Sequence, residues 1–176
     1  MKRVDMTNVQ EAGDFIKLPA GAYICKITKV EDFPAKEYLK VTYDISEGEF
    51  AGHFNSIRKD HADWAWVGAY VKSYKPTALP MFKRFCSAVS KSNAGYIFDG
   101  NINADEQTLV GKLIGITLGE EEYYGNDGEK KTRLYVSREF PIDQIGKQKV
   151  PALKTLKDEP ANDFTGVPTD IDLPFK

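Results

Sequence analysis

Aromatic and basic side chains occur close together at several points of the chain, a combination that suits binding of an unpaired nucleic-acid strand. Aromatic rings stack on bases, and lysine or arginine side chains neutralise phosphates. Tyr38 and Lys40 are two residues apart, as are Arg133 and Tyr135, so each pair shares one face of a strand. The predicted strand-binding set comprises Tyr38, Lys40, Arg58, Lys59, Trp64, Trp66, Tyr123, Tyr124, Lys130, Lys131, Arg133 and Tyr135.

The two tryptophans allow a second interpretation. Trp64 and Trp66 lie in the segment 60–77, which also contains Tyr70 and Tyr74. Large aromatic residues at this density often form a small cluster that packs beside a helix, and we expect at least one tryptophan to be packed in this way. Stacking on a base, which contributes about 1–3 kcal/mol, is the alternative for either residue.

Residues that could support catalysis or bind a metal are few. The sequence contains no GxSxG, HExxH or GxxxxGK[ST] motif. His53 and His61 have no cysteine or carboxylate at motif spacing, and the acidic residues 120–122 have no further ligands at a spacing that suits a cation. Cys25 and Cys86 lie far apart, which indicates neither a disulfide framework nor a zinc ribbon. We therefore predict a protein that is not an enzyme and has no catalytic residue, metal or cofactor.

Composition and charge indicate one domain with a packed core. Of 176 residues, 41% are apolar and 28% are charged, which argues against a disordered chain. No apolar run approaches the ~20 residues of a membrane span, and none follows Lys2 and Arg3, so we expect no membrane segment, no signal peptide and a cytoplasmic protein. The net charge of −2 is uneven: residues 158–176 hold five acids and one lysine, a charge of −4, which leaves +2 for residues 1–157.

Hydrophobic periodicity predicts five strands and one helix. We expect strands at 22–30, 38–45, 53–59, 109–118 and 133–140, and a helix that begins at Pro80 and ends before Asn93. The segment 38–45 alternates most clearly, with Leu39, Val41, Tyr43 and Ile45 on one face. In the predicted helix, the apolar positions are Met81, Phe82, Phe85, Cys86 and Val89. Asn126, Asp127 and Gly128 indicate a hairpin turn, and a short helical turn is expected after Pro141.

Three strands, a helix and two further strands follow one another in the order of an OB-fold barrel. The predicted fold is thus mainly β, a five-stranded barrel with one helix between the third and fourth strands; another small β-sandwich or barrel is the alternative. We place this domain at residues 1–146. Residues 147–176 have no periodicity and several prolines and acids, and they are expected to form a flexible acidic tail.

The last residues of the tail carry a more specific pattern. Acidic side chains precede an apolar residue, a proline and a phenylalanine, so acids could meet a basic rim while the apolar side chains enter a small pocket. A peptide of this kind docks on a partner without a fold of its own. The predicted partner-binding tip comprises Asp170, Ile171, Asp172, Leu173, Pro174 and Phe175.

This ending resembles the acidic tip of bacterial and phage single-stranded DNA-binding proteins, which end in acids, an apolar residue, proline and phenylalanine. It differs from them in that Lys176 follows Phe175. The body resembles a family of small OB-fold single-strand-binding proteins found in phage replication and recombination gene clusters. The similar segments are 18–23 (LPAGAY), 39–45 (LKVTYDI) with Gly48 and Gly52 after it, and 111–115 (GKLIG).

The resemblance implies sequence-tolerant binding of single-stranded DNA, a phage or prophage origin and action in the cytoplasm of a bacterial host. It also implies that the tip recruits replication or recombination proteins of the phage or the host. A protein-interaction adaptor or phage structural module on a small β-barrel is the alternative, because the body is nearly neutral and strong nucleic-acid binders are usually more basic. Exposed edge strands also leave a homodimer open.

Overall fold

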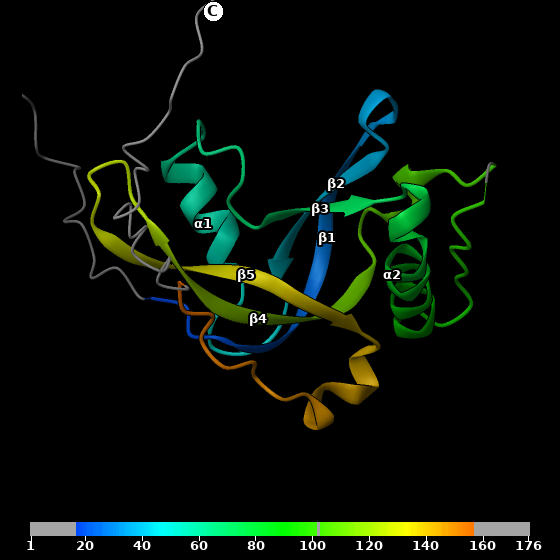
Figure 1. Cartoon of the computed structure of the whole chain (residues 1–176). Coiled ribbons are helices and arrows are strands. Elements are labelled where there is room, and N and C mark those ends of the chain that lie inside the picture. Colours follow the sequence, from blue (N-terminus) through cyan, green and yellow to red (C-terminus); the bar gives the residue numbers. More distant parts are fainter. Residues whose placement is uncertain (1–16, 102, 157–176) are drawn as a thin grey trace, which may run out of the picture.

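Five antiparallel strands form one sheet in the order β3-β2-β1-β4-β5 in the computed structural model of the chain, which describes residues 17–101 and 103–156. Figure 1 shows α1 and the free end of the β4–β5 hairpin at one end of the sheet and α2 at the other. The strands are β1 (Gly21–Phe33), β2 (Tyr38–Ile45), β3 (Ala69–Ser73), β4 (Leu113–Tyr124) and β5 (Lys130–Phe140). The helices are α1 (His53–Asp60) and α2 (Leu79–Ser92), with short 3-10 helices η1 (Pro34–Lys36), η2 (Pro76–Ala78), η3 (Glu106–Leu109) and η4 (Ile142–Lys147).

The strand β2 has the bounds and the buried face that its alternation predicts. Leu39, Val41, Tyr43 and Ile45 are all buried, since they face the core that the sheet encloses with α2. The opposite face is less open than the alternation indicates, because Asp44 is also buried. Local pattern therefore predicts the core face of β2 correctly and the environment of its other face less well.

The helix α2 covers the sheet with its predicted apolar face. Phe82, Phe85, Cys86 and Val89 are buried as expected, whereas Met81 is 48% exposed. Asn93 ends the helix as predicted, and its side-chain amide donates to the carbonyl of Val89 at 2.8 Å. The strands contribute to the same core the buried side chains of Cys25, Ile27, Val41, Tyr43, Ile114, Ile116 and Leu118.

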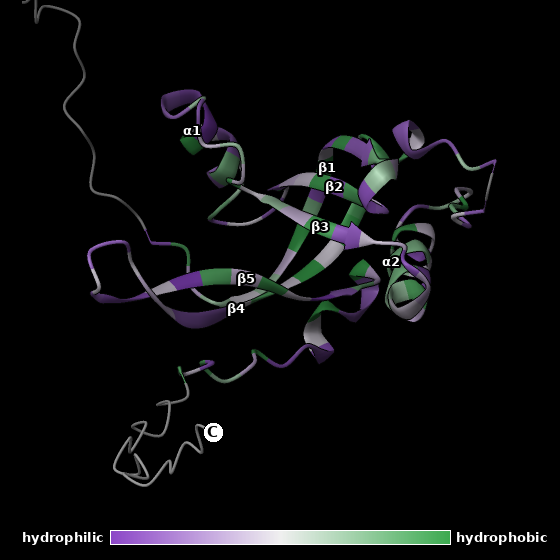
Figure 2. Ribbon diagram, turned by 45° about the horizontal axis from the view of Figure 1, so that its top comes forward, coloured by the Kyte–Doolittle hydropathy of each residue, from purple (hydrophilic) through white to green (hydrophobic). Residues whose placement is uncertain are grey.

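Two irregularities in strand pairing help the sheet to curve around this core. The pairing of β1 with β2 shifts between Ile27 and Lys29, and that of β4 with β5 shifts between Thr117 and Leu118. An extra residue in one strand of a pair bends that strand and increases its twist. Beyond the second shift the β4–β5 hairpin extends past the rest of the sheet, and Figure 2 shows that its free end is hydrophilic.

The expected third strand at 53–59 is wrong, because these residues form the helix α1. The helix begins after Gly52, whose φ of 78° suits glycine. Its free amides find an acceptor on β2: the Asp44 carboxylate accepts from Phe54 at 3.0 Å and from Asn55 at 3.1 Å. Such a cap satisfies backbone donors that a helix start otherwise leaves unpaired. The third strand is instead β3, within the aromatic segment 60–77.

The chain is mainly β with five strands as expected, but the sheet is not closed into the expected barrel, because β3 and β5 are its two edges. Side chains occupy the interval between these edges and keep their backbones from pairing. Lys72 lies opposite Leu39 and Glu139 opposite Ile116, so both charged side chains share the face that forms the core. Lys72 Nζ meets Glu139 Oε1 at 2.5 Å, with side chains only 9% and 3% exposed. An ion pair thus spans the open side of the sheet.

Other predicted boundaries shift by several residues. The strand β1 continues to Phe33, and β4 begins at Leu113 because residues 106–109 form η3. The predicted hairpin turn is present, with the Gly125 amide donating to the Glu129 carbonyl at 2.9 Å, and the helical turn expected after Pro141 is η4. None of the helices formed by residues 17–101 and 103–156 is long and apolar enough to cross a membrane.

The first residues of the predicted flexible tail are attached to the sheet. The amide of Glu122 donates to the carbonyl of Lys154 at 2.9 Å, and the amide of Lys154 donates to Glu120 at 3.0 Å. The Leu156 amide adds a bond of 3.0 Å to the Glu122 carboxylate. These bonds attach Lys154 and Leu156, which follow the predicted boundary at 146, to β4. The partner-binding tip lies outside the described residues.

The cap on α1 makes a first prediction. Replacement Asp44→Ala removes the acceptor of three amides, those of Ile45, Phe54 and Asn55. We expect the free energy of unfolding to fall by about 1–3 kcal/mol, since buried amides lose their partner, with a loss of helical circular dichroism. Urea unfolding measures the change. Asp63→Ala removes an exposed carboxylate nearby and is the control; equal stability of the two variants would contradict the role of Asp44.

Candidate nucleic-acid interface

A hollow of about 600 Å³ lies between the unpaired edges of β3 and β5. We call it the aromatic cleft. The turn after α1 forms one wall and the middle of β5 forms the other. Its walls include Trp64, Trp66, Tyr70, Val71, Glu121, Arg133, Leu134, Tyr135 and Val136. The volume is in the range of pockets that bind a small organic group.

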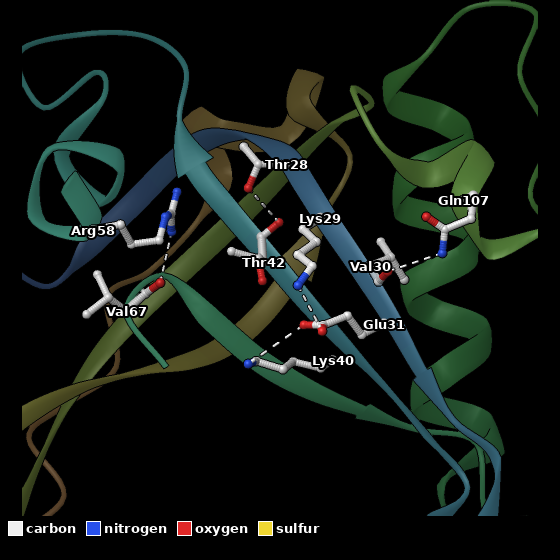
Figure 3. A network of polar contacts seen from close by, with 9 residues as sticks. All are labelled: Thr28, Lys29, Val30, Glu31, Lys40, Thr42, Arg58, Val67 and Gln107. Atoms are coloured by element: carbon white, nitrogen blue, oxygen red, sulfur yellow. Dashed lines mark hydrogen bonds and ion pairs between the residues drawn. The ribbon is translucent and has the colours of Figure 1, made fainter. Parts of the chain in front are cut away.

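Arg58 fixes the turn that carries the tryptophans. Its Nη1 donates to the carbonyl of Val67 at 2.9 Å (Figure 3). The same atom donates to the carbonyl of Tyr43 at 3.3 Å. Gly68 has a φ of 59°, and a Cβ there would lie 2.7 Å from the Tyr43 carbonyl oxygen, so only glycine fits. The guanidinium of Arg58 therefore supports the turn. This geometry does not favour its predicted role as a phosphate contact.

Both tryptophans are half-exposed, so the expectation that at least one is packed in a core is wrong. Trp64 is 49% exposed and Trp66 is 56% exposed. Trp64 stacks on His61 with centroids 4.0 Å apart, and Trp66 lies beneath Lys40 at 4.7 Å. From this segment, Tyr70 and Tyr74 pack against the core instead. Each indole thus keeps a large part of its surface available for another flat group.

Lys40 reaches the cleft from β2. The residue lies opposite Glu31 in the β1–β2 register, and Nζ is 3.8 Å from the Glu31 carboxylate. Lys29 approaches the same carboxylate at 2.9 Å, so two lysines share one acid (Figure 3). The hydrogen bond from Lys29 is the main reason why the pKa of Glu31 lies below its usual value. Cross-strand pairing therefore holds Lys40 over Trp66.

On the wall formed by β5, aromatic rings again lie beside basic side chains, one of which is paired with an acid. Arg133 lies directly opposite Glu121, and its Nε donates to that carboxylate at 2.8 Å. The guanidinium also lies 5.1 Å from the Tyr123 ring centroid. Lys154 places its ammonium 3.6 Å from the ring of Tyr135. The attached segment after η4 thus contributes a cation that the predicted set does not contain.

The structure brings only part of the predicted set together. Trp64, Trp66, Arg133 and Tyr135 line the cleft, and Lys40 and Tyr123 each contact one of these residues. The remaining members lie elsewhere. Lys59 is on the exposed side of α1, and Tyr38 stacks on Phe33 with centroids 4.9 Å apart. Tyr124, Lys130 and Lys131 belong to the free end of the β4–β5 hairpin.

The predicted cations are largely neutralised by neighbouring acids. The pairs are Lys40–Glu31, Lys130–Glu122, Lys131–Asp127 and Arg133–Glu121. Hydrogen bonds from the lysines hold the pKa values of Glu122 and Asp127 below their usual range, so these acids stay ionised at neutral pH. Exposed pairs of this kind contribute little to stability. A phosphate that binds Lys40 or Arg133 must therefore displace a carboxylate.

Tyr70 lines the cleft, and Lys72 and Glu139 line a neighbouring hollow; the sequence offers no local signal for these positions. The Tyr70 hydroxyl is buried near the Glu139 carboxylate. Burial, reinforced by the charge of Glu139, keeps its pKa well above the usual value, so the phenol stays protonated. A second hollow of about 270 Å³ shares Tyr70, Val71 and Val136 with the cleft. The two hollows therefore adjoin in the interval between β3 and β5, and together we call them the slot.

Residues 17–101 and 103–156 contain no cluster of three or more histidine, cysteine or acidic side chains that could hold a metal ion. Cys25 and Cys86 are buried and unpaired, and burial raises the pKa of Cys86 to about 11. No protein-family model matches the chain, and no curated protein sequence is significantly similar to it. Geometry and sequence pattern therefore carry the functional argument.

The buried pair across the slot makes a second prediction. Glu139→Gln leaves the Lys72 ammonium buried without its counter-charge, and we expect a loss of about 3–5 kcal/mol in the free energy of unfolding. The double variant Lys72→Met with Glu139→Leu removes both charges, and we expect it to recover most of that loss. Urea unfolding of the single and double variants provides the measurement. Additive losses in the double variant would show that the two charges do not interact.

Proposed function

We propose that the protein binds single-stranded nucleic acid, with single-stranded DNA as the expected ligand, and that bases stack in the aromatic cleft. The observation that carries the proposal is the pair of half-exposed indoles, Trp64 and Trp66, which line the same hollow as Tyr135. Stacking on such rings tolerates any base, because every base has a π-face. Paired bases within a duplex do not offer that face, so the proposal predicts a preference for single strands.

The sheet order supports an OB-type arrangement that is left open between its third and fifth strands. In the OB-fold, a helix follows the third strand and the barrel is only partly closed. Here α2 follows β3, and the slot occupies the place where β3 and β5 would meet. We propose that the protein uses this open side of the sheet as its binding surface.

We expect electrostatic attraction to contribute little to nucleic-acid affinity, because two of the cations near the cleft are paired with acids. Lys40 and Arg133 lie beside the cleft, but Glu31 and Glu121 neutralise them. Binding therefore depends on stacking more than on charge, and affinity falls with salt less steeply than for a binder with free cations. Replication or recombination in a phage or prophage is the proposed setting, in which the tip at 170–175 recruits partner proteins.

A third prediction tests stacking directly. We expect labelled oligo-dT to bind more tightly than a duplex of equal length, with quenching of tryptophan fluorescence and weaker binding at moderate salt. Trp66→Ala and the double variant Arg133→Ala with Tyr135→Ala each remove a stacking ring, and we expect affinity to fall about tenfold or more. Fluorescence anisotropy of the oligonucleotide measures all variants.

The matched control replaces Lys83 and Ile97 by alanine, which removes one cation and one exposed apolar side chain outside the cleft. Its affinity should equal that of the wild type. Equal affinity of the Arg133/Tyr135 variant would exclude these two residues from the site. Absence of oligonucleotide binding by both anisotropy and tryptophan fluorescence would exclude the proposed function and leave the protein-interaction adaptor.

A further inference from the structure

A separate hollow of about 450 Å³ lies between the end of β5 and η4. We call it the β5–η4 pocket. Arg138, Lys147 and Lys149 contribute to its walls, and no carboxylate does. The aromatic cleft and the second hollow of the slot, by contrast, each include an acid, Glu121 or Glu139. The β5–η4 pocket therefore concentrates positive charge that its own walls do not balance.

The three cations of this pocket form no ion pair within the part of the chain that the structure describes. This differs from Lys40 and Arg133, whose charges neighbouring acids already compensate. An anion in the β5–η4 pocket therefore meets cations without first displacing a carboxylate. Such a site binds an anion more favourably than one whose cations are already paired.

A buried hydroxyl provides a second and independent observation. Thr117 forms part of the pocket wall and is 2% exposed, yet its Oγ1 has no hydrogen-bond partner among the described residues. Buried hydroxyls are normally paired, and leaving one unpaired is unfavourable. A ligand oxygen in the pocket would supply the missing partner after a small local movement.

The backbone around the pocket is well fixed. The amide of Ile142 donates to Ser92 Oγ on α2 at 3.1 Å, which ties the start of η4 to the helix. Gln148 closes the other end, because its Nε2 donates to the Gln144 carbonyl at 3.0 Å. The shift in β4–β5 pairing places Arg138 directly opposite Thr117. Figure 1 shows η4 beside the end of β5.

We propose that the β5–η4 pocket binds a phosphate group. The planar guanidinium of Arg138 suits two phosphate oxygens at once, and Lys147 and Lys149 add charge without fixed geometry. Either a free phosphorylated compound or the backbone of a nucleic acid would supply this chemistry. Ser137 lines both this pocket and the slot, so a strand in the slot would pass close to it. The phosphate site itself does not depend on the proposed function.

A fourth prediction uses pyrophosphate as the probe and the full chain as the protein. We expect isothermal titration calorimetry to detect pyrophosphate binding, and Arg138→Gln to weaken it about tenfold or more. Thr117→Val keeps the side-chain shape and removes the hydroxyl, and we expect a loss of about threefold to tenfold. Lys83→Gln removes an exposed lysine of α2 that is not in the pocket and serves as the matched control. Circular dichroism confirms that each variant is folded.

Two oligonucleotides distinguish the sources of the phosphate. If a nucleic-acid backbone occupies the pocket, Arg138→Gln weakens binding of oligo-dT but not of the same oligonucleotide with a neutral methylphosphonate backbone. If a free phosphorylated compound occupies it, Arg138→Gln weakens pyrophosphate binding alone. Either result supports the site.

Absence of pyrophosphate binding, or equal affinity of the Arg138→Gln and Lys83→Gln variants, would overturn the site. Failure of the proposed function is a separate result. In that case, the wild type binds neither oligonucleotide while its response to pyrophosphate remains.

Discussion

The ion pair of Lys72 and Glu139 is the constraint on which the open side of the sheet depends. Both side chains point to the core face, and each lies on a strand edge that has no backbone partner. Their contact at 2.5 Å sets the interval between β3 and β5 at side-chain length, which is too wide for a backbone ladder. The core stays covered on this side, while the interval itself becomes a slot that an external group can enter.

The slot offers aromatic surface, whereas the β5–η4 pocket offers positive charge. Cross-strand register places an acid opposite two cations of the aromatic cleft, with Glu31 opposite Lys40 and Glu121 opposite Arg133. The cleft is thus rich in rings, and the charges of these two cations are compensated. Around η4, the chain folds back past the end of β5 and brings Lys147 and Lys149 to a pocket whose walls contain no acid. Stacking and charge are therefore separated in space along a single strand, β5.

The sequence predicts elements whose signals are local and misses those that depend on distant residues. Alternation locates β2, spacing locates α2, and a turn signal locates the β4–β5 hairpin. The helix at 53–59 is missed because its capping group is not local. The acceptor for its first amides, Asp44, belongs to the preceding strand. The open edge is equally hidden, since Lys72 and Glu139 are 67 residues apart in the chain. Composition gives no indication that such residues meet.

At the candidate site, the sequence likewise predicts which residues share a strand face but not which partners they meet. Alternation predicts Arg133 and Tyr135 on one side of β5, and both line the cleft with the tryptophans, as do Leu134 and Val136 of its other side. Register decides what each residue is then free to do, and a sequence does not reveal register. It pairs Arg133 with Glu121 and places Arg138 opposite Thr117, whose hydroxyl has no hydrogen-bond partner among the described residues. Arg58, on α1, is committed in a similar way, because its hydrogen bond to Val67 supports a turn. A basic residue is therefore informative about phosphate binding only after the carboxylates opposite it are known.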